Sequence, residues 1–349
     1  MPFVLSVPGQ NGLRVVSNSS DGILKKIKIL VLLLTGFDIS SFLTYKQFSN
    51  IKHHFQNFDI VQLINENSFF CNFYYEKKIL QYLFSNNKKI FLLSCGNDYI
   101  NVNHNFRNPN YKSIVQPYRE GKIKDSDFSN TLKYLSKEFE KLHHFIFNNI
   151  EGIIASDMDY HIPLKNEKKY LGLIQNPINI EKIQLKEIIS MDKIIIFHGI
   201  NRDNYYKKGN DFFEKALEII KIKFPDQIEI ITTENIPYNQ YINLYNKAHI
   251  LLDQCYAHDQ GYNALEAMAK EKVVFTGAEK EFLERYNLQE DEVAINAKPD
   301  VDYLVEKLSM LIENPEKIIQ ISKNARAFIE KEHDYILVAK KYLSTWNLG

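Results

Sequence analysis

The sequence has few cysteines, and their arrangement predicts neither a disulfide framework nor a metal site. Its three cysteines, Cys71, Cys95 and Cys255, are odd in number, widely separated and without CxxC spacing. Secreted disulfide scaffolds and structural zinc sites need several cysteines at short spacings. The sequence therefore predicts free thiols in a reducing, cytoplasmic compartment, and no metal-ligating residues.

An excess of charge and a long apolar run are also missing. Lys+Arg and Asp+Glu are equal at 43 each, which removes the whole-chain electrostatic argument for a nucleic-acid partner. The most apolar run, 29–37, has only about half of the ~20 residues that span a bilayer, and it lacks the cleavage site of a secretory signal. With 45% hydrophobic and 25% charged residues, the chain is expected to be globular.

Several motifs that identify common enzyme classes do not occur. The sequence contains no Walker A motif, GxSxG elbow, HExxH pair or GxGxxG dinucleotide fingerprint. Each of these supplies a specific geometry for phosphate, acyl, zinc or cofactor chemistry. Their absence argues against kinase, hydrolase, metalloprotease and dehydrogenase functions.

What the sequence does contain is a regular alternation of short apolar runs with longer helical patterns. Strands that are apolar on both faces and separated by helices are typical of parallel sheets covered on each side. In the first half we expect strands at 13–18, 59–65, 89–96 and 152–156, and helices at 45–56, 76–84 and 126–148. In the second half we expect strands at 193–201, 228–233, 250–254 and 273–277, and helices at 210–224, 241–248 and from 262.

This alternation predicts an α/β protein of two doubly wound, Rossmann-like domains. An Asn-Pro step within 173–183 indicates the join between them. We therefore expect an N-terminal domain at 1–176, a C-terminal domain at 177–332, and a final helix at 333–349 that packs back toward the N-terminal domain. The opening residues offer no convincing first strand, so the N-terminal domain is expected to be incomplete or unusually built.

The first candidate for chemistry is the loop after the strand at 193–201. It follows Gly199 and carries Arg202 and Lys208, and a helix begins just beyond it. Ligands of parallel sheets bind at the carboxyl ends of strands, where a helix N-terminus and cationic side chains favour phosphate. The alternative is a solvated polar loop, because Lys and Arg are usually surface residues.

The second candidate is "GYNALEAMAKEKVVFTG", which begins at Gly261. Gly261 permits close backbone approach, and the free amides near Tyr262 and Asn263 can bind anions or sugar hydroxyls. Glu266 follows one turn later, where a carboxylate can accept hydrogen bonds from a ribose diol. The alternative is an ordinary glutamate on a helix surface.

Two further turns follow expected strands. Ile236, Pro237 and Tyr238 make a tight strand exit whose backbone could contact a nucleotide base. Asp98 follows the strand at 89–96 and could orient a substrate hydroxyl, although Asn-Asp after glycine is also ordinary turn chemistry.

Together these stretches resemble the donor-binding domain of GT-B glycosyltransferases of the retaining family-four type (glycosyl transferases group one). The resemblance is carried by "NRDNYYKKG", "YNQYINLYNKAHILLDQ" and "GYNALEAMAKEKVVFTG", in that order and spacing. It covers 194–346 well and the first half only in broad pattern. The family implies two domains that face a cleft and close over a nucleotide-sugar.

The resemblance also assigns roles to residues of this sequence. It implies that Arg202 and Lys208 contact the donor diphosphate, that Glu266 binds the ribose, and that the amides of 261–263 approach the sugar and phosphate. Gly199, Ile236 and Tyr238 fall on the donor side of the same pattern. His258 stands where the family has the first of two acids, and Cys95 stands where it often has a histidine, so the donor sugar or the activity itself is expected to differ.

The function implied is transfer of a sugar from a UDP- or GDP-linked donor to a glycan or lipid-linked acceptor, as in polysaccharide biosynthesis. A retaining outcome, no metal and no cofactor beyond the nucleotide-sugar are implied by the same resemblance. Two alternatives stay open: a GT-B-like nucleotide-sugar epimerase, and an inactive subunit that binds a nucleotide or sugar. The basic stretch 112–141 is the expected place for peripheral contact with the inner face of a membrane, although such a stretch is more often a solvated helix face.

Overall fold

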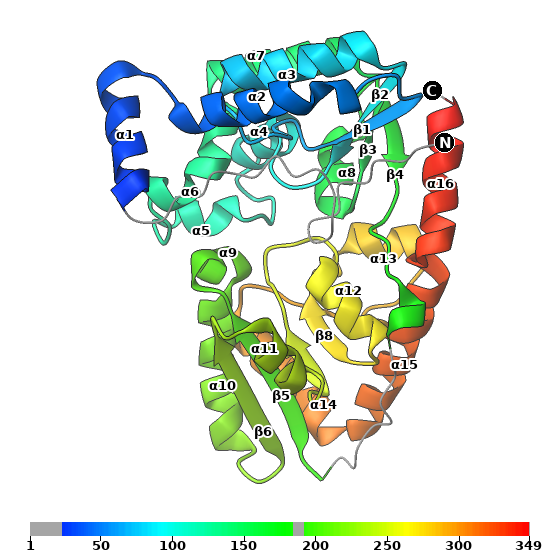
Figure 1. Ribbon diagram of the computed structural model, residues 1–349. Helices are drawn as coiled ribbons and strands as arrows, with labels where there is room; N and C mark the ends of the chain where they lie inside the picture. The colour runs from blue at the N-terminus through cyan, green and yellow to red at the C-terminus, as the bar shows by residue number, and fades with distance from the viewer. Residues whose placement is uncertain (1–22, 184–191, 349) are drawn as a thin grey trace.

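The computed structural model describes residues 23–183 and 192–348, and within them the chain forms two parallel β-sheets with flanking helices (Figure 1). The first sheet has four strands in the order β1-β2-β3-β4, and the second has five in the order β6-β5-β7-β8-β9. Neighbouring strands in both sheets of the described residues are parallel. This arrangement confirms the α/β fold class. The strand expected at 13–18 lies outside the described residues.

The first sheet is built from the N-terminal half. Its strands are β1 (Ile60–Ile64), β2 (Lys89–Ser94), β3 (Gly152–Ala155) and β4 (Tyr170–Leu173). The helices of this half are α1 (Ile23–Thr35), α2 (Ile39–Ile51), α3 (Phe73–Asn86), α4 (Tyr99–Arg107), α5 (Val115–Arg119), α6 (Asp125–Leu132), α7 (Lys137–Asn149) and α8 (Met158–Leu164). The edge strand β4 was not predicted, because it is only four residues long and contains Gly172 at a φ of 113°.

Two helix boundaries in this half differ from the predictions because polar side chains cap the helices. The helix expected at 45–56 begins at Ile39, where Asp38 accepts a hydrogen bond of 3.1 Å from the Ser41 amide. The helix expected at 126–148 is divided into α6 and α7, because Ser136 adopts an extended conformation and caps α7.

The second sheet is built from the C-terminal half. Its strands are β5 (Ile194–Ile200), β6 (Ile228–Glu234), β7 (Ile250–Leu252), β8 (Val273–Thr276) and β9 (Ile295–Asn296). Its helices are α9 (Tyr205–Lys208), α10 (Asn210–Lys223), α11 (Tyr238–Tyr245), α12 (Tyr262–Ala269), α13 (Lys280–Tyr286), α14 (Val301–Glu313) and α15 (Pro315–Glu332). Phe213, Ala216, Leu217 and Ile220 form the buried face of α10, as the 3.6-residue period of a helix requires.

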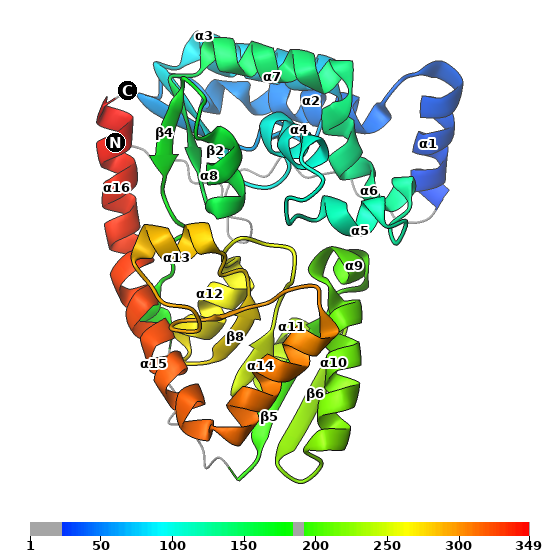
Figure 2. The same cartoon turned by 180° about the vertical axis from the view of Figure 1, so that it is seen from behind.

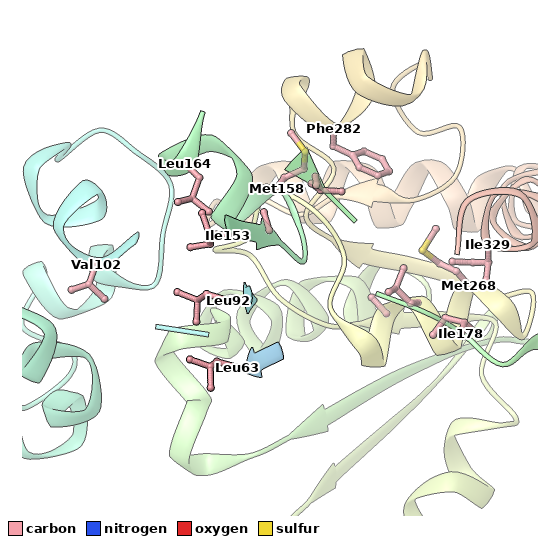
Figure 3. Close-up of a cluster of buried hydrophobic side chains, with 14 of the residues drawn as sticks. Leu63, Leu92, Val102, Ile153, Met158, Leu164, Ile178, Met268, Phe282 and Ile329 are labelled. Carbon is pink, nitrogen blue, oxygen red and sulfur yellow. The ribbon is translucent and has the colours of Figure 1, made fainter. Parts of the chain in front are cut away.

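One hydrophobic cluster continues from the first sheet into the second half. It contains Leu63, Leu92 and Ile153 from β1, β2 and β3, and it extends to Met268 and Phe282 (Figure 3). The halves are therefore packed on each other through apolar side chains as well as through polar loops.

The last helix, α16 (Tyr335–Leu348), runs alongside the N-terminal half (Figure 2). Val338 packs with Ile154 and Ile174, and the indole of Trp346 donates a hydrogen bond of 3.1 Å to Gln62 of β1. The end of the chain thus holds the first sheet against the second half.

No single helix among the described residues is both long and apolar enough to cross a membrane. One pair of helices, Lys26–Thr35 and Ile39–His54, meets that test together by length and composition, with a bend of 102° between them.

Candidate active site

The predicted donor-site residues lie at the carboxyl edge of the second sheet or in the loops that leave it. The strands β5, β6 and β7 end at Ile200, Glu234 and Leu252. Arg202 and Lys208 follow β5, Ile236 and Tyr238 follow β6, and His258 with 261–263 follows β7. Because β7 and β6 both pair with β5, these loops leave one edge of the sheet as neighbours.

Lys208 is held beside the start of α12 by a buried carboxylate. Its ammonium lies 2.9 Å from Oδ1 of Asp253, whose side chain is only 2% exposed. The same oxygen accepts a hydrogen bond of 3.1 Å from the side-chain Nδ2 of Asn263, and Oδ2 accepts one of 3.2 Å from the Thr276 hydroxyl. Asp253 therefore fixes the positions of a cation and of the first turn of α12. Sequence reasoning missed Asp253, although it stands directly after β7.

Two glycines shape this arrangement. Gly209 has a φ of 74°, and a Cβ there would lie 2.8 Å from the Cβ of Cys255, so only glycine lets the Lys208 loop pack on the β7 loop. At Gly261, by contrast, a Cβ would meet only the Gln254 amide at 3.9 Å. Gly261 is the N-cap of α12 and no side chain caps this helix, so its first-turn amides face a position where a ligand could approach closely.

Arg202 and Glu266 have partners of opposite charge on the surface. The guanidinium of Arg202 lies 2.6 Å from Glu234 at the end of β6, and both side chains are nearly half exposed. Glu266 lies 2.8 Å from Lys270, one turn further along α12. The Arg202 pair is exposed, and such pairs contribute only about 0.2–1 kcal/mol, so Arg202 can exchange its partner for a ligand at little cost. In the other pair Glu266 is 41% exposed and Lys270 only 15%, so Glu266 is the member that a ligand can reach.

The remaining donor-side predictions have mixed positions. Gly199 lies inside β5, where a Cβ would come within 2.8 Å of the Tyr241 ring, so this glycine serves packing between β5 and α11. Ile236 is half-buried in the loop after β6, and Tyr238 is the first residue of α11. Tyr262 is 55% exposed at the start of α12.

A family model described as glycosyl transferase-like matches residues 206–344, which include Lys208, Asp253 and the whole of α12. This part of the chain is therefore similar to that glycosyl transferase family. The match bears out the resemblance to group-one glycosyltransferases in the half where the site lies. No curated protein matches the chain in sequence.

Solved structures with a similar fold are glycosyltransferases of the GT-B type. Sucrose-phosphate synthase from Thermosynechococcus elongatus has a TM-score of 0.59 and 13% identity over 88% of this chain and 78% of its own. HepE from Anabaena, in complex with UDP, has a TM-score of 0.55 and 11% identity over 88% and 82%. TarM has a TM-score of 0.55 and 13% identity, and the alignment covers 89% of this chain but 59% of TarM. The fold is therefore GT-B.

In this glycosyltransferase fold, His258 contacts the N-terminal half. Its ring stacks on Tyr111 with centroids 4.4 Å apart, and its Nε2 lies 3.1 Å from the Lys112 carbonyl. Its backbone amide donates to the Asp159 carboxylate at 3.2 Å. The residue is 5% exposed, so the position where the family has an acid is occupied by contacts between the two halves.

Asp98 is placed at the carboxyl end of β2, with its side chain turned into the protein. It is 2% exposed, caps α4 by accepting from the Asn101 amide at 2.7 Å, and accepts a hydrogen bond from Ser94. Burial, with the nearby Glu66 carboxylate, raises the pKa of Asp98 to about 7. In this structure both carboxylate oxygens serve local contacts.

Three carboxylates that the sequence analysis did not single out meet between the two halves. Asp157 and Asp159 follow β3, Asp259 follows β7, and one oxygen from each lies within 4.8 Å of the others. Asp259 also accepts a hydrogen bond of 2.9 Å from the Met158 amide. Burial, and then mutual repulsion, raises the pKa of Asp157 and of Asp259 well above the usual range. Within the described ranges this is the group whose atoms could hold a metal ion.

The basic stretch 112–141 is divided: Lys124, Lys137 and Lys141 are exposed, and its other three lysines contact the protein. Lys112 pairs with Glu279 at 2.6 Å, and Lys122 pairs with Asp211 at 3.0 Å, so both lysines join the two halves. Lys133 donates to the Asn67 side chain at 2.7 Å. Three of its lysines thus belong to internal contacts rather than to a free basic face.

Proposed function

We propose that this protein is a glycosyltransferase that uses a nucleotide-sugar donor, UDP- or GDP-linked, and passes the sugar to a glycan or lipid-linked acceptor. The family match and the GT-B fold support transferase activity. HepE and TarM have been solved with UDP, which supports a nucleoside diphosphate as the leaving group here. The observation that carries the proposal is the position of Lys208 next to the uncapped start of α12.

In the proposed reaction, the bond between the anomeric carbon and the diphosphate oxygen breaks as the acceptor oxygen bonds to that carbon. Negative charge develops on the departing diphosphate. Lys208 and the α12 amides would stabilise this charge, because they are held in place before the reaction and need no rearrangement. We assign this role to protein cations and amides, so the proposed reaction is metal-independent, and we propose a retaining outcome.

Two charged side chains would exchange partners when the donor binds. Arg202 would leave Glu234 for a phosphate oxygen, and Glu266 would leave Lys270 to accept hydrogen bonds from the ribose hydroxyls. The Arg202 pair is exposed and weak, and Glu266 is itself 41% exposed, so both side chains can reach a ligand. Gly261, which has open space around its Cα, would let the sugar approach the backbone.

The test is ligand binding followed by turnover. UDP, GDP and ADP are compared by thermal shift, because a ligand that binds only the folded state raises the melting temperature. With the best donor, Lys208→Ala should lower turnover about 10²- to 10³-fold. Lys215→Ala, which removes an exposed lysine of α10, is the matched control. Normal transfer by Lys208→Ala would refute the assignment.

The second candidate function is a binding subunit without turnover. It is favoured by two observations: His258 is occupied by Tyr111, and both Asp98 oxygens are used internally. Calorimetry that detects nucleoside diphosphate binding, with no product from any donor and acceptor tried, would select this candidate over the enzyme.

A further inference from the structure

Helix α1 exposes an unusual amount of apolar surface. Seven of its leucine and isoleucine side chains are more than 40% exposed, and Leu33 and Leu34 reach 77% and 75%. They are Leu24, Ile27, Ile29, Leu30, Leu32, Leu33 and Leu34. Figure 1 shows α1 at the edge of the N-terminal half, joined to α2 by a sharp bend.

These apolar positions surround the helix instead of forming a stripe. At about 100° per residue, the seven positions leave no gap wider than about 80° around the axis. A helix that is apolar on all sides is normally buried in a protein core or in lipid. Packing against α2 can cover only one side of α1, so most of this surface needs another apolar environment.

An aromatic row continues from α1 onto the body of the protein. Phe37 lies 5.6 Å from Phe42, Phe42 lies 6.1 Å from Tyr75, and Tyr75 lies 5.4 Å from Tyr45 (centroid distances). Phe37 and Phe42 are 43% and 38% exposed, and Tyr74, which stacks edge-on against Tyr75, is 56% exposed. Aromatic rings with a polar tip collect at the boundary between lipid and water.

The row ends at a hollow between α2 and α3 that carries two lysines. The hollow has a volume of about 210 Å³ and is lined by Tyr45, Phe48, Ser49, Lys52, Lys78, Gln81 and Tyr82. Lys78 lies over the ring of Tyr45, and Lys52 lies over the ring of Tyr82. Their ammonium groups could pair with a lipid phosphate while their stems stay on apolar surface.

The charge of this segment favours an anionic partner. Residues 23–58 contain five lysines and a single carboxylate, Asp38, and that carboxylate caps α2. Three of the lysines, at 25, 26 and 28, lie in the first half of α1. Each lysine near an anionic bilayer contributes about 1 kcal/mol to binding.

We propose that α1, the aromatic row and the lysines of the hollow form a docking surface that lies in the plane of an anionic phospholipid membrane. With 13 residues, α1 is about 20 Å long, which is shorter than the ~30 Å hydrocarbon core. It therefore lies in the interface instead of spanning it. In the stretch 112–141 three lysines, at 112, 122 and 133, are engaged in the protein, and we place the main membrane contact on α1 and the hollow.

The proposal deepens the proposed function, on which its consequence for the acceptor rests. The docking surface belongs to the N-terminal half, whereas the donor loops belong to the second sheet in the C-terminal half. A transferase held on lipid by that half would meet an acceptor that is itself anchored in the membrane. Of the two proposed acceptor classes, glycan and lipid-linked, the docking surface thus favours the lipid-linked acceptor.

The test is sedimentation of the full chain with two kinds of vesicle. One is phosphatidylcholine alone, and the other is an equal mixture of phosphatidylcholine and phosphatidylglycerol. We expect binding to the mixed vesicles that weakens at high salt. The double substitution Leu33→Glu and Leu34→Glu should lower the partition coefficient roughly 100-fold or more, because two leucines no longer enter lipid. Lys52→Gln and Lys78→Gln should each lower it about fivefold.

Ile222→Glu is the matched control, because Ile222 is 83% exposed on α10, in the other half. It should bind vesicles like the wild type. Wild-type protein that stays in the supernatant with both vesicles, or a control that loses as much binding as the double variant, would overturn the proposal. A third outcome would also overturn it: a wild-type protein that is dimeric and does not bind vesicles, together with a double variant that is monomeric. In that case α1 would serve self-association. UDP thermal shifts of the same proteins test the donor site separately, so the two proposals can fail independently.

Discussion

The ion pair between Lys208 and Asp253 allows one perturbation to separate a structural role from a ligand-binding role. Lys208→Met keeps the length of the side chain and removes its charge. Asp253 is then left 2% exposed with only the neutral donors Asn263 and Thr276. A hydrogen bond to a charged group contributes about 1.5–3 kcal/mol, whereas removing one partner of a fully buried pair costs about 3–5 kcal/mol. Because the Lys208 side chain is 31% exposed, water can replace part of the interaction. We expect a loss of about 2 kcal/mol in the free energy of unfolding.

The companion variant Asp253→Asn removes the buried charge and leaves Lys208 partly hydrated, so it should cost less, about 1 kcal/mol. In the double variant the two losses should not add, and the coupling energy should be about 1 kcal/mol or more. Urea unfolding measures the free energy of unfolding of the wild type and the three variants. The fluorescence of the single tryptophan, Trp346, gives the signal, because its indole on α16 donates a hydrogen bond to Gln62 of β1 in the folded state. Equal slopes against urea would show that the variants change stability alone.

Affinity for UDP, measured by calorimetry, completes the test. Lys208→Met should weaken binding about 10- to 100-fold, because the cation is lost. Asp253→Asn keeps the cation and should weaken binding less than about tenfold. Additive stability losses would refute the coupling that we infer from the distance of 2.9 Å. Equal affinities in Lys208→Met and the wild type would refute the diphosphate role, whatever the stability.

Three other perturbations test separate parts of the structure. The pKa of Asp98 is raised to about 7, so the folded state binds a proton at this carboxyl more tightly than the unfolded state does. The stability that this proton contributes is present below about pH 4 and is lost as the pH rises to about 7. Asp98→Asn should therefore flatten the pH dependence of the urea midpoint, and an unchanged profile would contradict the burial argument. Glu266→Ala should change stability by only about 0.5 kcal/mol, because its pair with Lys270 is an i,i+4 pair on one helix. It should nevertheless weaken UDP binding about 10- to 150-fold, and an unaltered affinity would remove its ribose role. Lys112→Ala deletes the 2.6 Å pair with Glu279, so it should destabilise the protein by about 2 kcal/mol and speed proteolysis between the halves. If the variant resists protease as well as the wild type does, the pair does not join the halves.

The sequence predicted the central strands of the second sheet well because they are buried on both faces, whereas the two-residue edge strand β9 was not predicted. Every residue of β7 and β8 is buried, and such runs are short, apolar and bounded by polar turns. The helix ends were harder to predict, because one side chain decides each of them. Asp38 and Ser136 each accept a single backbone hydrogen bond, and neither bond changes the apolar period on which the prediction depended.

The site was predicted in part, for a related reason. Lys208 and Gly261 stand in loops that a parallel sheet must bring to one edge, so the sequence order of the strands was enough to place them together. Asp253 was missed because its role depends on which strands are neighbours. β7 pairs directly with β5, and this pairing brings the residue after Leu252 next to the loop that carries Lys208. An acid that directly follows a central strand is therefore a candidate partner for any cation in a neighbouring loop.

The apolar run near the N-terminus shows why length alone is an insufficient criterion for lipid contact. Ile29 to Phe37 is too short to span a bilayer, and length therefore argued against the membrane. Periodicity carries different information: Leu32, Leu33 and Leu34 are consecutive, so a helix through them cannot bury all three against one neighbour. Their exposures of 44%, 77% and 75% are what this argument requires once the run is helical. A 13-residue helix with this much exposed apolar surface is too short to span a bilayer, and the lysines in its first half supply the charge that anionic headgroups attract, so the membrane interface is the environment that fits it.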